Sequence, residues 1–424
     1  MTVSEKAPAR SKADGPPTQA VILAGGRGTR LRPLTDTLPK PMAPFHGRPF
    51  LAYLLDLLRG QGIERVLLLL GYLAENVQAH FGDGSRFGLA IDYSVSPVED
   101  ETGRRLRLAE GKLDPRFLLL YCDNYWPMPL AKMWTKFSAA GAPAMVTVYA
   151  NRDHYTRNNV RVGEDGRVLA YDKSRTQAGL NGVEIGYALL SRSVLDLLPE
   201  GNVSFEGSVY PALVERGLLH AFVTEHRYYS VGSHERLPLT EAFLAPQKAV
   251  ILDRDGVLNK KPPRASYVRT WDEFEWLPGA IESLRALKQA GYKTILVTNQ
   301  AGVARGVMGE GDLKALHERM QAGLREAGAE LDAIYYCPHG WDEGCFCRKP
   351  SPGMLFQAQR EHHLDLTKTV FIGDDERDLE AGTAAGCPTF LVSPACPLPE
   401  CIHQHVPLKG GPLNYELTGS RHRP

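Results

Sequence analysis

Apolar residues in this chain form short unbroken runs that alternate with longer segments of helical spacing. Unbroken runs at 65–72 and 116–124 predict strands buried on both faces, as does the run that opens 20–28. The spacing of apolar residues in 49–62 predicts an amphipathic helix that ends at a glycine. A further apolar run at 144–150 predicts another buried strand.

The same alternation returns in the second half of the chain. Predicted strands and helices follow one another there at 249–252, 280–291, 293–300, 312–328 and 369–375. Strands that are apolar throughout and separated by helices are typical of parallel sheets covered on both faces. The predicted fold class is therefore α/β, with two doubly wound, mainly parallel-sheet domains.

The length of the chain also indicates more than one domain. Its 424 residues exceed the size of one ordinary core, given roughly one domain per 150 residues. We place one domain at 19–245 and a second at 248–393. Residues 1–18 have mixed charge and no apolar run, so we expect a disordered lead-in, and Pro, Gly and His in 394–424 predict a loosely ordered tail.

Composition narrows the class of partner and the compartment. Basic and acidic residues both number 49, and no segment approaches the ~20 apolar residues of a membrane span. We therefore expect small-molecule substrates and neither nucleic acid nor membrane as a partner, with the oligomeric state left open. Seven cysteines without an export signal indicate reduced thiols and a cytoplasmic protein.

The stretch "DRDG" at 253–256 follows an apolar strand at once. Asp253 and Asp255 leave the strand on the same side, so one carboxylate can attack while the other moves a proton. Later strand ends and loops supply partners for this chemistry: uncharged donors, cations for a phosphate and a carboxylate for a hard cation. These candidates are Thr298, Asn299, Arg305, Arg348, Lys349 and Asp374, with Asp375 and Asp378 near the last.

The stretches "DRDG", "ILVTNQAG", "CRKPSPGM" and "FIGDDERD", in this order, resemble the four motifs of the haloacid dehalogenase superfamily of phosphatases over most of 248–393. The resemblance implies that Asp253 is the nucleophile that becomes an aspartyl phosphate. Asp255 would be the general acid and base and would also bind Mg²⁺ through its backbone carbonyl. Thr298 and Lys349 would hold the phosphoryl group, and Asp253 and Asp374 would complete the Mg²⁺ site.

A cysteine-rich segment, "CPHGWDEGCFC", precedes the lysine motif. Cys337, His339, Cys345 and Cys347 form a three-sulfur, one-nitrogen set suited to tetrahedral Zn²⁺. Because all four positions are filled, the predicted zinc is structural and braces the loop that carries Arg348 and Lys349. The alternative is that these cysteines are buried by chance and bind no metal.

With "TNQAGVARG" and "CRKPSPGM", this loop resembles two groups of phosphatases. One group acts on D-glycero-D-manno-heptose 1,7-bisphosphate and the other on histidinol phosphate, and the motifs favour the heptose group. That group often carries lysine directly after its last motif aspartate, where this chain has Asp375. A negative charge thus replaces a positive one, which we expect to change contacts with the substrate and to leave the phosphoryl transfer itself unaffected.

A glycine-rich turn follows the first predicted strand, in "LAGGRGTRLRPLTDTLPKPM". Gly25, Gly26 and Gly28 let backbone amides approach a triphosphate closely, and Thr29 extends this binding loop. Arg27, Arg30 and Lys40 add positive charge. A glycine turn alone is weak evidence, but the lysine motif after it strengthens the prediction of a nucleotide site.

The segment resembles the nucleotide-sugar pyrophosphorylases, with a Rossmann-like domain, over roughly 18–240. The resemblance implies that a sugar 1-phosphate attacks the α-phosphate of a nucleoside triphosphate and releases pyrophosphate. Arg30 and Lys40 would stabilise the phosphates, and Asp123 would hold Mg²⁺. Lys173 would grip the sugar phosphate and Glu184 the sugar hydroxyls, unless both are solvated surface charges.

One departure concerns the metal. Where the family usually has a second magnesium-binding aspartate, this chain has Ser230, a poor ligand for a hard dication. There are three alternatives. Asp123 and the nucleotide phosphates hold the metal, or the domain catalyses the transfer slowly, or the domain only binds nucleotide or sugar phosphate without catalysis. We favour the first, because the triphosphate loop is otherwise complete.

Together the two resemblances predict a bifunctional enzyme of surface-polysaccharide (lipopolysaccharide-type) precursor synthesis. The phosphatase would remove the C7 phosphate of the heptose bisphosphate, and the transferase would join the heptose 1-phosphate to a nucleoside triphosphate, by resemblance GTP. The alternatives are a phosphatase for another phosphomonoester such as histidinol phosphate, and a front domain that only binds nucleotide or sugar phosphate and regulates it. Cys396, Cys401, His403 and His405 are weak candidates for another metal site, and an irregular tail is the favoured interpretation.

Overall fold

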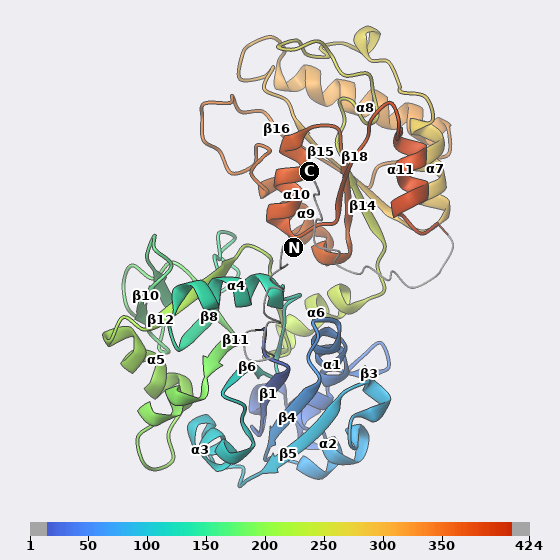
Figure 1. The fold of residues 1–424 in the computed structure, drawn as a ribbon. Helices are drawn as coiled ribbons and strands as arrows, with labels where there is room; N and C mark the ends of the chain where they lie inside the picture. The colour runs from blue at the N-terminus through green and yellow to red at the C-terminus, as the bar shows by residue number, and fades with distance from the viewer. Residues whose placement is uncertain (1–14, 409–424) are drawn as a thin grey trace, which may run out of the picture. The chain divides into compact units, whose positions relative to one another are not determined.

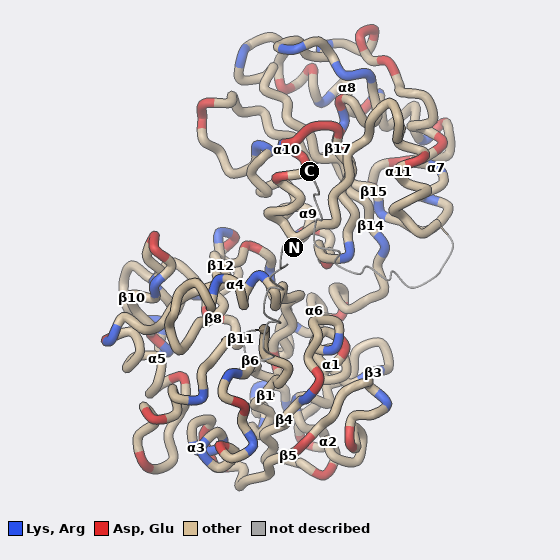
Figure 2. The backbone as a smooth tube through the Cα atoms, in the orientation of Figure 1, with Lys and Arg blue, Asp and Glu red and all other residues tan. Residues whose placement is uncertain are grey.

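The computed structural model describes residues 15–408. The chain divides between Leu244 and Ala245 into two compact units, and each is a sheet with helices on both faces (Figure 1). Basic and acidic residues are interspersed over the described parts of both units (Figure 2). Residues 1–14 of the predicted lead-in and 409–424 of the predicted tail lie outside the described residues.

The first unit is built on a seven-stranded sheet in the order β12-β8-β11-β6-β1-β4-β5. Its strands are β1 (Gln19–Ala24), β4 (Arg65–Leu70), β5 (Ala90–Val95), β6 (Arg116–Tyr121), β8 (Ala144–Tyr149), β11 (Val183–Ser191) and β12 (Leu219–Thr224). Only β11 runs antiparallel to its neighbours in this sheet, β6 and β8. The prediction of a mainly parallel sheet is confirmed for this unit.

Alternate residues of the central strands face two separate cores. Ile22 of β1 packs in the core under α1 (Phe50–Gly60), α2 (Ala74–Phe81), α4 (Leu130–Ala140) and α6 (Leu237–Leu244). Val21 and Leu23 pack in the opposite core, under α3 (Thr102–Leu108) and α5 (Phe205–Glu215). Burial on both faces explains why these strands carry no polar alternation. Two-residue to four-residue strands complete the unit: β2 (Pro44–Phe45), β3 (Arg48–Pro49), β7 (Asn124–Tyr125), β9 (Val160–Val162), β10 (Val168–Tyr171) and β13 (Tyr229–Ser230).

The second unit has a five-stranded, fully parallel sheet in the order β16-β15-β14-β17-β18. The strands are β14 (Ala249–Leu252), β15 (Lys293–Asn299), β16 (Ala333–Cys337), β17 (Val370–Gly373) and β18 (Thr389–Leu391). The helices α7 (Ala280–Gln289) and α8 (Glu310–Glu326) cover one face, and α9 (Gly353–His362) and α10 (Glu376–Ala385) cover the other (Figure 1). The doubly wound arrangement predicted for this half is confirmed.

The predicted loose tail is wrong for its first part. Residues Leu398–His405 form helix α11, which follows Pro397 at its N-cap and buries Leu398, Cys401 and Ile402 in the same core as α7. Tyr292 donates a hydrogen bond to the carbonyl of Pro407, 2.7 Å away. The helix was missed because its apolar positions are few and its sequence is rich in Pro and His.

Parallel strands bring their carboxyl ends to one edge of each sheet, where ligands bind in α/β proteins. In the first unit this edge carries the loop after β1 and the turn after β6, and in the second it carries the segments after β14, β15 and β17. Within residues 15–408, no helix has the length and apolar character needed to cross a membrane.

Candidate active sites

A cavity of about 660 Å³ opens at the carboxyl ends of β14, β15 and β17 in the second unit. Its lining includes all of the phosphatase candidates predicted from the sequence, together with cations and aromatic residues that were not predicted. The predicted residues at this cavity are Asp253, Asp255, Thr298, Asn299, Arg305, Arg348, Lys349, Asp374, Asp375 and Asp378. The motifs, which are far apart along the chain, therefore meet at one cavity in the fold.

Lys349 lies at the bottom of this cavity between two carboxylates. Its Nζ is 2.9 Å from Oδ1 of Asp253 and 2.6 Å from Oδ1 of Asp378, and it donates to the carbonyl of Val297 at 3.0 Å. All three charged side chains are buried. A buried lysine paired in this way is a fixed positive charge beside the candidate nucleophile.

Burial controls the ionisation of this pair. Burial raises the pKa of Asp253, and the neighbouring carboxylates of Asp378 and Asp255 add to the rise while Lys349 opposes it. Burial also acts to lower the pKa of Lys349, but Asp253 and Asp378 outweigh it and hold that pKa above its usual value. The lysine is therefore charged at neutral pH, and a cation bound beside Asp253 would favour its carboxylate form.

Asp255 has a separate set of partners. Arg254, whose side chain is fully buried, donates from Nη2 to both carboxylate oxygens at 3.0 Å. Asn259 and Gln300 donate to the same carboxylate at 2.9 Å each. Burial acts to raise the pKa of Asp255, but Arg254 and these hydrogen bonds outweigh it, so the pKa is lowered.

Arg254 is held in turn by His317 of α8. Nη1 of Arg254 donates to Nε2 of His317 at 3.1 Å, which requires the neutral imidazole with its proton on Nδ1. Burial and the adjacent guanidinium lower the pKa of His317 to about 3, so the acceptor form persists. The sequence placed Arg254 between two aspartates without indicating this role.

Carboxylate oxygens of Asp253, Asp374 and Asp378 lie within 4.8 Å of one another. Oxygen ligands in this number suit Mg²⁺, which also keeps several waters. The side chain of Asp255 is outside this group, as expected if it would contribute its backbone carbonyl. Gly256 has φ +91°, and a Cβ there would collide with the carboxylate of Asp374, so the turn requires glycine.

The negative charge of Asp375 is neutralised locally. Asp375 is the N-cap of α10, where its side chain accepts from the amide of Arg377. Lys261, from the loop after β14, places Nζ 3.3 Å from Asp375 and 2.8 Å from Asp374, and Arg377 donates to Asp375 at 2.8 Å. Positive charge therefore reaches this wall of the cavity from Lys261 and Arg377.

The remaining phosphatase candidates have distinct positions. Thr298 is buried, and its Oγ1 accepts from Gln300 at 2.9 Å. Asn299 makes two hydrogen bonds with the backbone of Lys349, at 2.9 and 3.0 Å, so it braces the lysine loop as well as lining the cavity. Arg305 lies near the ring of Tyr267 at the cavity wall.

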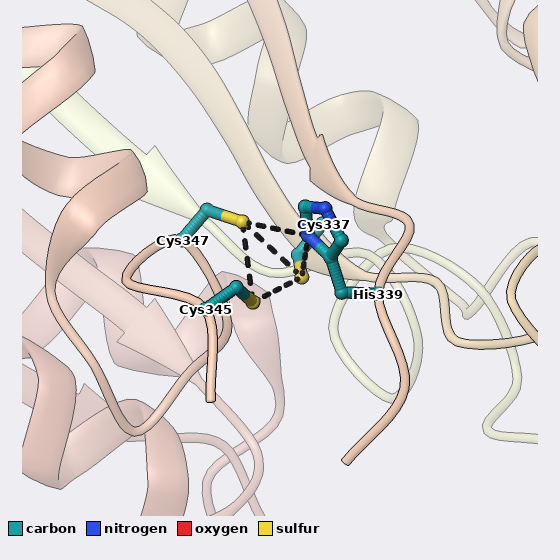
Figure 3. Close-up of side chains that lie close together, drawn as sticks. All are labelled: Cys337, His339, Cys345 and Cys347. Carbon is teal, nitrogen blue, oxygen red and sulfur yellow. Dashed lines mark hydrogen bonds between the residues drawn. The ribbon is translucent and has the colours of Figure 1, made fainter. Parts of the chain in front are cut away.

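The four zinc candidates converge at the end of β16 (Figure 3). The three sulfur atoms are 3.4, 3.5 and 3.6 Å apart, and Nδ1 of His339 is 3.6 Å from Cys337 and 3.2 Å from Cys347. Sulfur ligands about 2.3 Å from a tetrahedral zinc ion would be about 3.8 Å apart. The side chains therefore already stand close to the geometry that zinc requires.

In the first unit, the glycine-rich loop follows β1. Gly28 has φ +64°, and a Cβ there would meet Thr35 and Lys40, whereas nothing approaches the position of a Cβ on Gly26. Thr29 and Arg30 lie on an exposed 3₁₀ turn, and Nζ of Lys40 is 3.1 Å from the carboxylate of Asp123. Lys40 and Asp123, distant in sequence, thus meet at the carboxyl ends of β1 and β6.

Gly25 lies against a side chain that the sequence did not place beside it. A Cβ on Gly25 would collide with the guanidinium of Arg105, a buried residue of α3. Arg105 donates to the carbonyls of Leu70 at 2.6 Å and Pro97 at 2.8 Å. It thereby ties the end of β4 to the segment after β5, directly beside the glycine-rich loop.

Ser230 lies beside the candidate metal ligand Asp123. The backbone amide of Val231 donates to the carbonyl of Asp123 at 2.8 Å, and the Ser230 hydroxyl accepts from the amide of Gly232 at 3.0 Å. No group of three or more metal-ligating side chains occurs in the described part of the first unit. Asp123 therefore stands without a second carboxylate supplied by position 230.

Lys173 and Glu184 lie near a partly buried carboxylate that was not predicted, Glu206 of α5. Nζ of Lys173 is 2.7 Å from Glu206, which also accepts from Tyr121 and Thr102 at 2.8 Å each. Burial raises the pKa of Glu184 to about 8, although the Gly186 amide opposes the rise. A protonated Glu184 can donate a hydrogen bond, as recognition of a sugar hydroxyl would need.

Comparison with known proteins follows the same division. The nucleotidyl transferase family model matches residues 19–244, and the model described as "HAD-hyrolase-like" matches residues 346–394. The chain belongs to the nucleotidyl transferase family. The first unit is the transferase unit from here on.

The second unit is similar to D-glycero-beta-D-manno-heptose-1,7-bisphosphate 7-phosphatase of Bordetella bronchiseptica, with 43% identity over 34% of this chain and 80% of the relative. A relative of that name from Pseudomonas aeruginosa is 45% identical over 34% of this chain and 79% of its own. The second unit belongs to the same family as these phosphatases and is called the phosphatase unit. Among solved structures, HddC from Yersinia pseudotuberculosis complexed with GMP-PN is 25% identical, with 51% of this chain and 95% of that chain covered and a TM-score of 0.45.

The tail candidates for another metal do not assemble. Within residues 15–408, the groups of metal-ligating side chains are the two in the phosphatase unit, and neither includes Cys396, Cys401, His403 or His405. Cys401 is buried in the core, and the ring of His405 stacks on Phe390 at 3.6 Å between centroids. Cys401 and His405 therefore serve the packing of α11.

Proposed function

We propose that this chain carries two consecutive steps of nucleotide-sugar synthesis. The phosphatase unit removes the C7 phosphate of D-glycero-D-manno-heptose 1,7-bisphosphate. The transferase unit then joins the heptose 1-phosphate to a nucleoside triphosphate, with GTP as the expected donor, and releases pyrophosphate. The product of one unit is the substrate of the other, which is the simplest reason for their presence in one chain.

The observation that carries the phosphatase proposal is the set of arginines that lines its cavity in addition to the lysine beside the nucleophile. Lys349 already faces the candidate nucleophile, yet Arg264, Arg305 and Arg348 also line the cavity. One phosphoryl group needs only the first of these. The additional arginines suit a second phosphate on the same substrate, as in a sugar bisphosphate.

The phosphatase chemistry follows from the positions of the two aspartates. An Oδ of Asp253 attacks phosphorus, the bond to the sugar oxygen breaks, and Asp255 donates a proton to that oxygen. Asp255 then accepts a proton from water as the water oxygen attacks phosphorus, which frees phosphate and restores Asp253. The Arg254–His317 pair and Gln300 hold Asp255 in place and favour its carboxylate form, which suits the second step. For the first step, the negative charge of the bound substrate would have to raise the pKa of Asp255 so that it carries the proton it donates.

The transferase chemistry rests on Arg30 and Lys40. Both would stabilise negative charge on the phosphates while the sugar phosphate oxygen attacks the α-phosphorus and the bond to pyrophosphate breaks. Lys173 and Glu184 would orient the sugar 1-phosphate. Lys40 pairs with Asp123 in the structure. Binding of a triphosphate would therefore replace Asp123 by a phosphate as the anionic partner of Lys40.

Two kinds of metal ion fit the chain. Mg²⁺ would be held by Asp253, Asp374 and the Asp255 carbonyl in the phosphatase unit, and by Asp123 with the nucleotide phosphates in the transferase unit. When bound, Mg²⁺ neutralises charge that develops on phosphoryl oxygens. Zn²⁺ would be structural, held by Cys337, His339, Cys345 and Cys347. The cytoplasmic location stays a prediction from the unpaired cysteines.

A two-step assay tests the function. The purified full chain is given each anomer of heptose 1,7-bisphosphate with GTP, ATP, CTP or UTP, and the nucleotide sugar is identified by mass. We expect GDP-heptose, together with one phosphate and one pyrophosphate per product. Equal hydrolysis of histidinol phosphate would overturn the substrate assignment, and GTP binding without pyrophosphate release would reduce the first unit to a binding module.

A further inference from the structure

Trp341 stands out among the large apolar side chains of the phosphatase unit because 71% of its surface is exposed. A single exposed apolar side chain is common in itself, but an exposed indole would gain free energy on contact with a ligand, which would be one reason for its exposure. Trp341 belongs to the segment between His339 and Cys345, within the set of zinc candidates. None of the roles assigned above to that loop uses an aromatic ring.

The position of Trp341 supplies the reason. It lines the same cavity as Asp253, Lys349 and Arg348. A cavity of about 660 Å³ is far larger than a phosphoryl group requires and lies in the range of sites for small organic ligands. The space beyond the reacting phosphate must therefore receive the rest of the substrate, and Trp341 is part of its wall.

The loop that presents Trp341 is braced on both sides. The amide of Gly340 donates to the carboxylate of Glu343 at 2.6 Å, and Nη1 of Arg348 donates to the carbonyl of His339 at 3.4 Å. The metal-ligating side chains before and after Trp341 converge on one another. An aromatic ring on a braced loop loses little conformational entropy when it contacts a ligand.

We propose that Trp341 is a specificity-determining residue that stacks on the sugar ring of the phosphatase substrate. A pyranose presents a face of polarised C–H bonds, and the negative face of an indole attracts it while both lose apolar contact with water. Arg348, on the other side of the zinc loop, would hold the distal phosphate of the same sugar. The inference rests on the proposed function, since it takes a cyclic sugar phosphate as the substrate.

The kinetic test compares Trp341→Ala and Trp341→Phe with the parent chain. The substrates are heptose 1,7-bisphosphate and acetyl phosphate, which has a reactive phosphoryl group and no ring. We expect Trp341→Ala to raise KM for the sugar bisphosphate roughly five- to tenfold with a smaller change in kcat. The preference for the sugar over acetyl phosphate should fall by a similar factor, and Trp341→Phe should restore most of it.

A binding measurement separates stacking from a purely structural role. The unreactive Asp253→Asn chain is titrated with heptose 1,7-bisphosphate, and indole fluorescence is followed. We expect a change in emission that is mostly lost in Asp253→Asn/Trp341→Phe. Zinc content is measured on each variant, and Leu391→Ala, an exposed apolar residue away from the cavity lining, is the matched control.

The outcomes distinguish this inference from the proposed function. If the parent shows no preference for the sugar bisphosphate over acetyl phosphate, the proposed function fails. If the parent shows that preference and Trp341→Ala keeps it, stacking is refuted while the function stands. Loss of zinc with equal loss of activity on both substrates would also refute stacking, because it would make Trp341 a support of the loop.

Discussion

Asp253 and Asp123 both follow the carboxyl end of a parallel strand, but their surroundings differ. Asp253 is buried beside Lys349, and two further carboxylates lie within 4.8 Å. Asp123 forms an ion pair with Lys40 at 3.1 Å, and a serine occupies the neighbouring position 230. Arg30 and Thr29 of the transferase loop are exposed, whereas Lys349 and Thr298 are buried.

The two sites differ in how many of their charged groups are already in place before a substrate binds. In the phosphatase unit, the protein itself fixes the charges around the reacting phosphorus, which is the preorganisation that lowers barriers in polar reactions. In the transferase unit, the triphosphate brings much of the negative charge that the loop and the metal must meet. We therefore expect the phosphatase to be sensitive to single side chains and the transferase to depend more on ligand and metal concentrations.

Removing the proposed nucleophile should have the largest effect and should separate the two sites. Asp253→Asn is expected to lower phosphatase kcat by at least ~10³-fold, because an amide cannot form the acyl phosphate. Pyrophosphate release from GTP and heptose 1-phosphate should stay within about twofold. Phosphate and pyrophosphate are measured on the same preparation, and loss of both activities would show that the sites are not independent.

Removing one of the proposed zinc ligands should have the next largest effect. Cys345→Ser is expected to lower the zinc content from about one ion per chain and to reduce phosphatase kcat/KM roughly 10- to 100-fold, because the loop bearing Arg348 and Lys349 loses its brace. Zinc is measured by mass spectrometry of the metal. Cys396→Ser, outside the cluster, is the control and should retain zinc; a parent chain without zinc would refute the site.

Ser230→Asp sharpens the comparison by adding the missing carboxylate. We expect the Mg²⁺ concentration that gives half-maximal pyrophosphate release to fall about fivefold, since carboxylates are preferred ligands for a hard dication. Ser230→Asn, similar in size but neutral, should resemble the parent. An identical Mg²⁺ dependence in the aspartate variant would mean that position 230 does not face the metal.

The smallest expected effect is a pH dependence of stability from Glu184. The pKa of Glu184 is raised from an ordinary 4.5 to about 8, so between these pH values the folded chain holds a proton that the unfolded chain has lost. The stability of the parent therefore decreases as pH rises through this window. Thermal unfolding of the full chain at pH 5, 6.5 and 8 should show Glu184→Gln gaining roughly a few degrees relative to the parent as pH rises. A difference that does not vary with pH would contradict the raised pKa.

The site residues that could be predicted from the sequence are those in motifs that follow one another in a fixed order along the chain. Asp253, Thr298, Lys349 and Asp374 each follow a recognisable segment, and the parallel sheet brings them to one edge. Asp378 was noted only as a neighbour of Asp374. Its contact with Lys349 depends on the first turn of α10, where the side chain turns back toward the strand end.

Other contacts could not be predicted because they join distant segments through buried side chains. Arg254 between two aspartates gives no sign of its contact with His317, 63 positions later. Lys173 and Glu206 are brought together by the packing of α5 against the sheet. Helix α11 escaped prediction because its stability comes from packing on α7 rather than from helical propensity.

The guanidinium of Arg105 has a consequence for the evolution of the glycine-rich loop. The three nearest neighbours of a Cβ on Gly25 would all be atoms of the Arg105 side chain. Positions 25 and 105 are therefore coupled: alanine at 25 would displace the Arg105 guanidinium from its hydrogen bonds to Leu70 and Pro97. Related chains that carry arginine at position 105 should retain glycine at 25, and substitutions at the two positions should be inherited together.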